Sequence, residues 1–209
     1  MTGMTTILLP TTKLKMPALL FVFSLVSFVL LMVIVIGLVL PSFPNGIGEL
    51  TPQQMSSFLG KYLLTQAFPL VPILLGVAGI ALLYPSLKET AGRRSAWLAL
   101  IVAVLMGILY LVLIIFRMSL VRFSDATLSA NSVWQWTSLA YDKLGLILPA
   151  TATLFIGVSL YQSRLLRWTG LTIAFLSGIL IPLVFFVGYP PFVFGFLWLA
   201  IGIGLLSRK

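Results

Sequence analysis

Six long apolar runs, separated by short polar or basic segments, dominate the pattern of hydrophobic and polar positions along the chain. The runs are Met16–Leu40, Phe68–Tyr84, Ala96–Phe116, Leu139–Tyr161, Trp168–Val187 and Pro191–Leu206. A helix needs about 20 mainly apolar residues to cross a hydrocarbon core of roughly 30 Å. The pattern therefore predicts an all-α fold, a polytopic membrane protein with six transmembrane helices in a single helical-bundle domain over residues 1–209.

Two of the polar segments are long enough to contain structure of their own. Residues 41–67 include Thr51, which is suited to cap a helix, and Pro52, which is suited to its first position. Residues 117–138 include Trp136, a residue type that prefers the interface between lipid and water. We expect both segments to be external loops, each with a short helix at the membrane surface.

Basic residues are distributed unevenly between the two sides of the predicted spans. One side has nine: Lys13, Lys15, Lys88, Arg93, Arg94, Arg164, Arg167, Arg208 and Lys209. The other side has four: Lys61, Arg117, Arg122 and Lys143. Cytoplasmic loops carry an excess of Lys and Arg, so this asymmetry places both termini in the cytoplasm, with residues 1–15 as a cytoplasmic tail.

The composition changes this picture little. Of the 209 residues, 60% are hydrophobic and 8% are charged, whereas soluble domains have about 25% charged residues. The chain has no Cys and no His, which excludes disulfides, thiolate metal sites and His-ligated metals or haem. We expect no metal and no cofactor. The net charge of +9 is explained by topology, so nucleic acid is not an expected partner.

Two pairs of apolar runs are similar to each other. When Pro72 is placed on Pro149, the Leu-Tyr pairs eleven and twelve residues downstream also align. When Trp97 is placed on Trp168, several Leu, Ala and Gly positions align after it. We interpret the second–third and the fourth–fifth hairpins as two copies of one unit, flanked by the first and last spans. Chance similarity between leucine-rich helices is the alternative.

Small residues recur every four positions on the third and fifth runs. They are Ser95, Ala99, Ala103 and Gly107 on the third, and Gly170, Ala174 and Gly178 on the fifth. Residues spaced in this way share one helix face, where small side chains let two helices approach closely. Two interpretations stay open: packing between helices of this chain, or docking of a partner subunit.

Prolines fall within the second, fourth and fifth runs. They are Pro69, Pro72, Pro149 and Pro182. Each removes a backbone donor and kinks its helix, and the carbonyl group that loses its partner needs another from protein or water. This pattern predicts kinked spans that face protein or a cavity. Hydroxyl groups within the spans, such as those of Thr153 and Ser159, are expected to bond to carbonyl groups of their own helix.

The last predicted hairpin is rich in aromatic residues. Phe192, Phe196 and Trp198 are candidate contacts for a lipid or another apolar ligand, although packing within the bundle and contact with lipid explain them as well. Near the other large loop, Asp142 is a candidate ion-pair partner of Arg117 or Arg122.

One late segment resembles a known group of membrane proteins. The run from Leu160 to Gly170 reads Leu-Tyr-Gln-Ser-Arg-Leu-Leu-Arg-Trp-Thr-Gly and precedes a span rich in small residues. It resembles the turn between two late spans of uncharacterised six-span bacterial membrane proteins of the DUF4386-like type. The resemblance implies a protein of the bacterial inner membrane, and it implies no catalytic residue.

The sequence favours a non-catalytic integral membrane protein, an accessory or structural subunit that packs within a larger membrane complex. Its expected partners are membrane lipids and other membrane-protein subunits, including a second copy. One alternative is a small carrier or channel for a neutral or apolar solute, based on the prolines and the repeat. Another is a lipid- or quinone-binding protein that uses the aromatic hairpin. No paired carboxylates or known catalytic motif are present, so we do not expect an enzyme.

Overall fold

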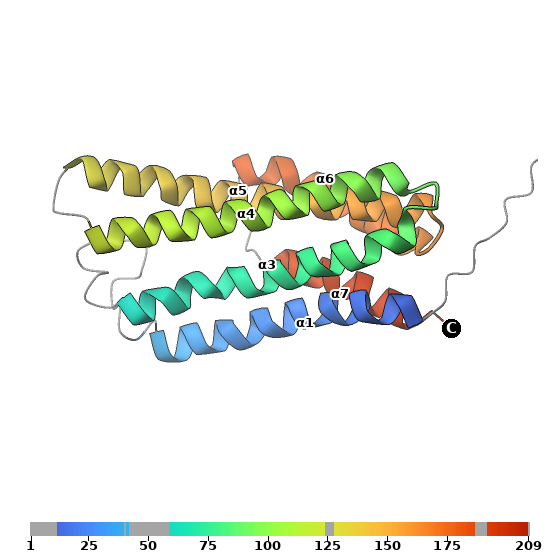
Figure 1. Cartoon of the computed structure of the whole chain (residues 1–209), viewed down its shortest axis with the longest axis horizontal. Coiled ribbons are helices and arrows are strands. Elements are labelled where there is room, and N and C mark those ends of the chain that lie inside the picture. Colours follow the sequence, from blue (N-terminus) through green and yellow to red (C-terminus); the bar gives the residue numbers. More distant parts are fainter. Residues whose placement is uncertain (1–11, 40, 42–58, 124–127, 187–191, 209) are drawn as a thin grey trace, which may run out of the picture.

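The computed structural model describes residues 12–39, 41, 59–123, 128–186 and 192–208. Within these residues, six α-helices form one bundle (Figure 1): α1 (Thr12–Ile34), α3 (Leu59–Leu87), α4 (Arg93–Phe123), α5 (Leu128–Gln162), α6 (Arg167–Phe186) and α7 (Phe192–Leu206). A five-residue π-helix, η1 (Val35–Val39), continues α1.

Five of these helices are long and apolar enough to cross a membrane. The candidate spans are Lys13–Gly37, Leu70–Leu87, Arg93–Phe116, Asp142–Gln162 and Arg167–Phe186. The sixth apolar helix, α7, is shorter, with an apolar segment of Val193–Leu206. The outer surface of the bundle exposes large apolar side chains such as Leu30, Ile115 and Phe175, which is the pattern expected where the solvent is lipid. The chain is a multi-pass helical membrane protein.

The helices pack in an order that partly follows the chain. Helix α1 lies between α3 and α7, α4 lies between α3 and α5, and α6 packs mainly on α5. The first residues of α1 and the last residues of α7 lie at the same end of the bundle, on the right of Figure 1. Arg208, after α7, donates a hydrogen bond from Nη2 to the carbonyl oxygen of Arg164 at 3.3 Å. The turn between α5 and α6 therefore shares this end, which we call the terminal end.

The turn between α5 and α6 contains an unusual backbone conformation. Arg164 has φ 57°, in the left-handed region that favours glycine. Its N–H donates to the carbonyl oxygen of Tyr161 at 3.1 Å, and the N–H of Leu166 donates to that of Leu160 at 3.3 Å. These bonds satisfy carbonyl groups at the end of α5, where the helix leaves them without partners.

The second predicted external loop differs from the structure. Residues 117–123 continue α4, and residues 128–138 form the first part of α5. No Gly or Pro interrupts the chain between Phe116 and Gly145, so the helices extend beyond their apolar spans instead of forming a separate surface helix. In the first predicted loop, residues 59–67 belong to α3. The expected helix around Thr51 lies outside the described residues.

The helices differ greatly in length. At about 1.5 Å per residue, the 35 residues of α5 extend about 52 Å, whereas the 20 residues of α6 extend about 30 Å. Helices α3 and α4, with 29 and 31 residues, are also long. These three helices extend past α6 at the end opposite the terminal end, on the left of Figure 1.

Candidate functional site

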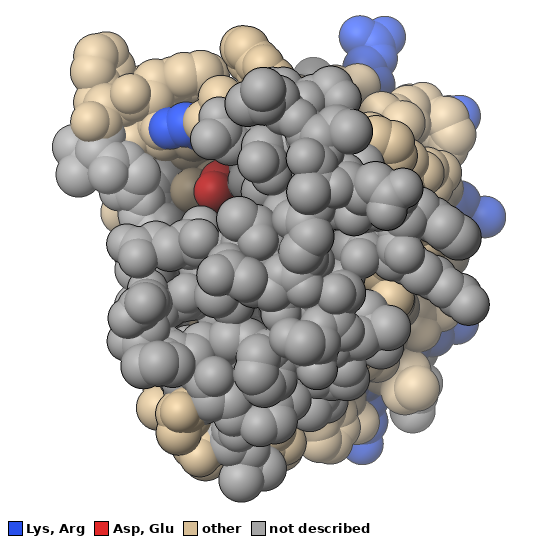
Figure 2. Space-filling model, turned by 90° about the vertical axis from the view of Figure 1, so that its left-hand side faces the viewer, with Lys and Arg blue, Asp and Glu red and all other residues tan. Residues whose placement is uncertain are grey.

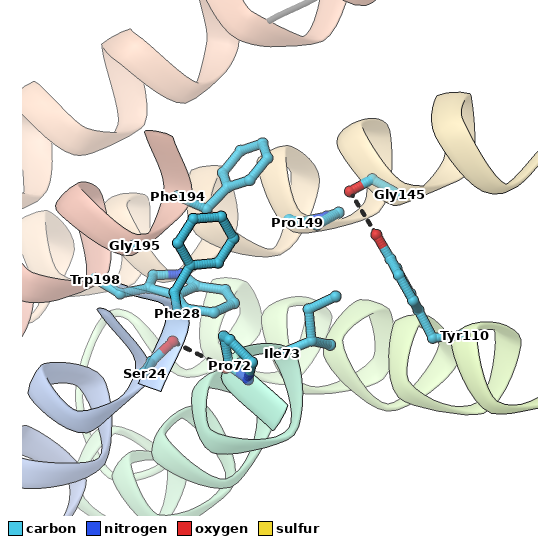
Figure 3. A pocket seen from close by; sticks show the side chains of 10 residues that line it. All are labelled: Ser24, Phe28, Pro72, Ile73, Tyr110, Gly145, Pro149, Phe194, Gly195 and Trp198. Carbon is cyan, nitrogen blue, oxygen red and sulfur yellow. Dashed lines mark hydrogen bonds between the residues drawn. The ribbon is translucent and has the colours of Figure 1, made fainter. Parts of the chain in front are cut away.

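A small cavity inside the bundle is the strongest candidate for a binding site (Figure 3). Its volume is about 30 Å³, and α6 contributes none of the residues that line it. The lining residues are Ser24, Phe28, Pro72, Ile73, Tyr110, Gly145, Pro149, Phe194, Gly195 and Trp198. All are buried, four carry aromatic rings and none is charged. A water molecule needs roughly 10–15 Å³ by this measure, so the cavity has room for about two or three water molecules.

Pro149 explains one wall of the cavity. Proline has no N–H, so the carbonyl group of Gly145, four residues earlier in α5, loses its usual partner within the helix. Tyr110 of α4 supplies another, because its hydroxyl group donates to this carbonyl oxygen at 3.0 Å in a buried position. A side chain at Gly145 would overlap the Tyr110 hydroxyl group. The glycine, the proline and the tyrosine thus form one interhelical contact.

The opposite wall is held by hydrogen bonds from α1 and α7. Ser24 of α1 donates from Oγ to the carbonyl oxygen of Pro72 in α3 at 2.8 Å. Trp198 of α7 donates from Nε1 to Oγ1 of Thr153 in α5 at 2.9 Å. The indole ring lies directly on Gly76 of α3, where a side chain would overlap it. Each polar side chain that lines the cavity is therefore engaged in a bond between two helices.

Polar groups near the two ends of the bundle are used in the same way. Lys143 donates from Nζ to the carbonyl oxygen of Val184 at 2.7 Å. This is one of the last four carbonyl groups of α6, which have no partner within the helix, and a positive charge at a helix C-terminus is favourable. At the terminal end, Ser159 of α5 donates from Oγ to the carbonyl oxygen of Gly92, just before α4, at 2.9 Å.

The small residues predicted on the third span lie partly inside the bundle. Ala99 and Ala103 are fully buried. A Cβ atom at Gly107 would make ordinary contacts with Leu74 and Val77 of α3, at 3.8 and 3.9 Å. Ser95 donates from Oγ to Oε1 of Gln162 at 3.0 Å.

The small residues predicted on the fifth span lie against α5. A Cβ atom at Gly170 would lie 2.7 Å from the backbone oxygen of Gly157, and one at Gly157 would lie 2.7 Å from the backbone nitrogen of Ala174. Gly178 is less crowded, with Leu154 Cδ1 at 3.9 Å from such an atom. These contacts favour helix packing within the chain over docking of a partner at these faces.

The aromatic candidates of α7 occupy different environments. Trp198 is 2% exposed and lines the cavity, whereas Phe196 is 56% exposed on the outer surface. The side chain of Phe192 lies outside the described part of the chain. Phe194 lines the cavity but was not among the sequence candidates. Its spacing of four from Trp198 was a usable signal, since residues at i and i+4 share a helix face.

The predicted ion pair of the second loop involves one described side chain. Asp142 is exposed and lies 14 residues after the first residue of α5. Figure 2 views the end opposite the terminal end and shows acidic and basic atoms not far apart at one edge. Among the charged side chains that the structure describes, Asp142 and Lys143 are those toward this end. The side chains of Arg117 and Arg122 lie outside the description, so their pairing with Asp142 stays a prediction.

Comparison with known proteins identifies no relative of this chain. No family model matches the chain, and neither a curated protein nor a solved structure matches it. The likeness to DUF4386-like proteins therefore stays an expectation from the sequence.

Proposed function

We propose that this protein is a non-catalytic integral membrane protein that serves as an accessory or structural subunit of a larger membrane complex. The observation that supports this function is the use of the interior polar groups. Tyr110, Trp198 and Ser159 each bond to a neighbouring helix or turn. Carriers of polar or charged solutes direct such groups toward a solute at mid-depth instead.

We propose that the protein lies in a bacterial inner membrane and crosses it six times, with α7 as the last span. Both termini would then lie in the cytoplasm. The support for this topology is the distribution of charge. Eight described basic side chains, all exposed, lie at the terminal end: Lys13, Lys15, Lys88, Arg93, Arg94, Arg164, Arg167 and Arg208. The one acidic side chain described there is Glu89. An excess of basic residues in short loops is typical of the cytoplasmic side.

Isolation of the protein from native membranes tests the proposed role. The full chain, tagged at native expression level and extracted in a mild detergent, is expected to elute with further membrane-protein subunits or a second copy. The particle mass would then exceed that of one chain with its detergent. A matched preparation from cells that express an unrelated tagged membrane protein identifies background. A clean monomer without a specific companion would contradict the proposal.

A second candidate function is binding of a lipid tail or a quinone in the cavity. The observation in its favour is the lining by four aromatic rings and two prolines. Pockets that hold drug-sized ligands measure about 300 Å³ or more, so side chains that line the cavity of about 30 Å³ would have to move for such a ligand to enter. Extraction and mass identification of bound lipids decides this candidate, and the lack of any stoichiometric ligand would contradict it.

The third candidate is a small carrier or channel for a neutral or apolar solute. Pro72 and Pro149, which align in the proposed repeat, both line the cavity, one from α3 and one from α5. Related hairpins that contribute equivalent residues to one cavity are a feature of carriers built from repeats. Uptake of labelled neutral solutes into proteoliposomes, compared with protein-free vesicles, tests this candidate.

A further inference from the structure

Three arginines from two distant segments come together at the terminal end. Arg164 lies in the turn after α5, Arg167 begins α6, and Arg208 follows α7. The bond from Arg208 Nη2 to the Arg164 carbonyl oxygen, at 3.3 Å, joins residues that are 44 apart in sequence. Leu165, next to Arg164 in sequence, and Leu205, three residues before Arg208, belong to the buried core, at 5% and 3% exposed. The three arginines, which we call the arginine cluster, are all exposed.

Two aromatic rings hold the central arginine of the cluster. The Cζ atom of Arg167 lies 5.8 Å from the ring centre of Tyr161 and 5.9 Å from that of Trp168. Attraction between a guanidinium group and a ring face restrains the side chain. The N–H groups at the edge of a guanidinium group point outward in its plane, in the fork geometry that suits a phosphate.

No acidic side chain balances this charge in the segments that form the cluster. Residues 159–186 and 192–209 contain no Asp and no Glu. At the terminal end, Glu89 belongs to a different turn, between α3 and α4. Several cations held near one another without an acidic neighbour attract an anion from their surroundings.

The depth of the cluster identifies the source of that anion. The candidate spans Asp142–Gln162 and Arg167–Phe186 end and begin at this turn, so the turn lies at the level of lipid headgroups. Trp168, 75% exposed, is the residue type preferred at this interface.

An apolar track continues from the cluster along α6. Leu171, Phe175 and Ile179 follow Arg167 at intervals of four residues, which places them on one side of the helix. They are 42%, 67% and 42% exposed. The twelve helical steps from Arg167 to Ile179 cover about 18 Å, a length comparable to half of a hydrocarbon core of roughly 30 Å.

We propose that the arginine cluster binds the phosphate headgroup of an anionic phospholipid, whose acyl chain lies along Leu171, Phe175 and Ile179. A free phosphate ion shares the headgroup chemistry but would not use the apolar track.

Native mass spectrometry of the purified full chain tests the site, with phosphatidylglycerol and phosphatidylcholine as probes. We expect phosphatidylglycerol to bind at least about tenfold more tightly, since each basic residue near an anionic headgroup contributes appreciably. Replacement of all three arginines by glutamine (Arg164→Gln, Arg167→Gln and Arg208→Gln) should reduce this affinity to that for phosphatidylcholine. Equal binding of both lipids by the unmodified chain would overturn the proposal.

The matched control removes the same charge elsewhere at the same end. Lys88→Gln, Arg93→Gln and Arg94→Gln change three exposed basic residues outside the cluster. This control should keep the affinity for phosphatidylglycerol within about twofold. If both triple variants lose affinity equally, diffuse charge and not a built site binds the lipid, and the proposal falls.

Two further arms complete the test. Inorganic phosphate in excess should leave bound phosphatidylglycerol unchanged, whereas displacement of the lipid by phosphate would assign the site to a soluble anion instead. If the glutamine variant does not fold, an Arg→Lys triple keeps the charge but loses the guanidinium fork. It should bind phosphatidylglycerol about threefold more weakly or worse. An unchanged affinity in the lysine variant would overturn the site as described.

Discussion

At the scale of single residues, the contact between Tyr110 and Gly145 gives a sharp prediction. Tyr110→Phe removes the donor to a carbonyl group that Pro149 has deprived of its helical partner. A buried carbonyl group left without a partner costs about 1–2 kcal/mol. We expect the free energy of unfolding to fall by that amount, measured by SDS titration of the protein in bicelles with tryptophan fluorescence as the signal.

Pro149→Ala is the control for this prediction. Alanine restores an N–H in α5 that bonds to the Gly145 carbonyl oxygen, so the carbonyl group no longer depends on Tyr110. Tyr110→Phe should then cost less than about 0.5 kcal/mol, and the double-mutant cycle gives the coupling energy. An equal cost in both backgrounds would show that the tyrosine acts through packing and not through the carbonyl group.

At the scale of elements, the crossing of α5 and α6 distinguishes glycines that the sequence pattern treats alike. A Cβ atom at Gly170 would lie 2.7 Å from backbone atoms of Gly157 and Tyr161, which cannot move without separating the helices. Gly170→Ala should therefore lower the free energy of unfolding by about 1–3 kcal/mol. The same SDS titration measures it.

Gly178→Ala is the matched substitution on the same face of α6. Its Cβ atom would find only Leu154 Cδ1, at 3.9 Å, and alanine favours the helix over glycine by up to about 1 kcal/mol. We expect this variant to be as stable as the unmodified protein or more so. A larger loss at Gly178 than at Gly170 would disprove the close crossing at Gly157.

At the scale of the whole molecule, the arrangement predicts which positions share a side of the membrane. The chain has no native cysteine, so single cysteines report location directly. Lys88→Cys and Ser207→Cys lie at the terminal end, and Trp136→Cys, at a residue that is 71% exposed, lies toward the opposite end. In intact cells, a membrane-impermeant maleimide should label position 136 alone, whereas lysis should expose all three positions. Labelling of positions 88 and 207 on different sides would contradict the fold.

The sequence predicted the helices well because hydrophobic length is a direct signal of a membrane span. The ends of the helices were harder to predict than their presence. Hydropathy marks where a segment leaves the hydrocarbon, but a helix stops only where its backbone is interrupted, and nothing interrupts α5 between Leu128 and Gly145. Residues 117–123 and 128–138 are therefore helical, although they lie outside the candidate spans Arg93–Phe116 and Asp142–Gln162.

The cavity was only partly predictable. The chemistry of proline predicts that Pro149 leaves the Gly145 carbonyl group without a donor in its own helix. That Tyr110 supplies the donor depends on the register of α4 against α5, which the sequence does not show. Hydroxyl groups were expected to bond within their own helices. Thr151 does so, with Oγ1 at 2.8 Å from the carbonyl oxygen of Ile147, whereas Ser159 bonds to the turn before α4. Such choices depend on which neighbour packs closely, and that information is not local in sequence.

At Arg164 the left-handed backbone lowers folding stability, whereas the charged side chain is proposed to raise the affinity for a phospholipid. A left-handed conformation costs an L-residue about 1–2 kcal/mol, a cost that glycine does not bear. Arg164→Gly should therefore raise the unfolding free energy while it removes one of the three charges proposed to hold a phospholipid. Folding stability alone favours glycine here, so the arginine adds its charge to the cluster at a cost in folding free energy.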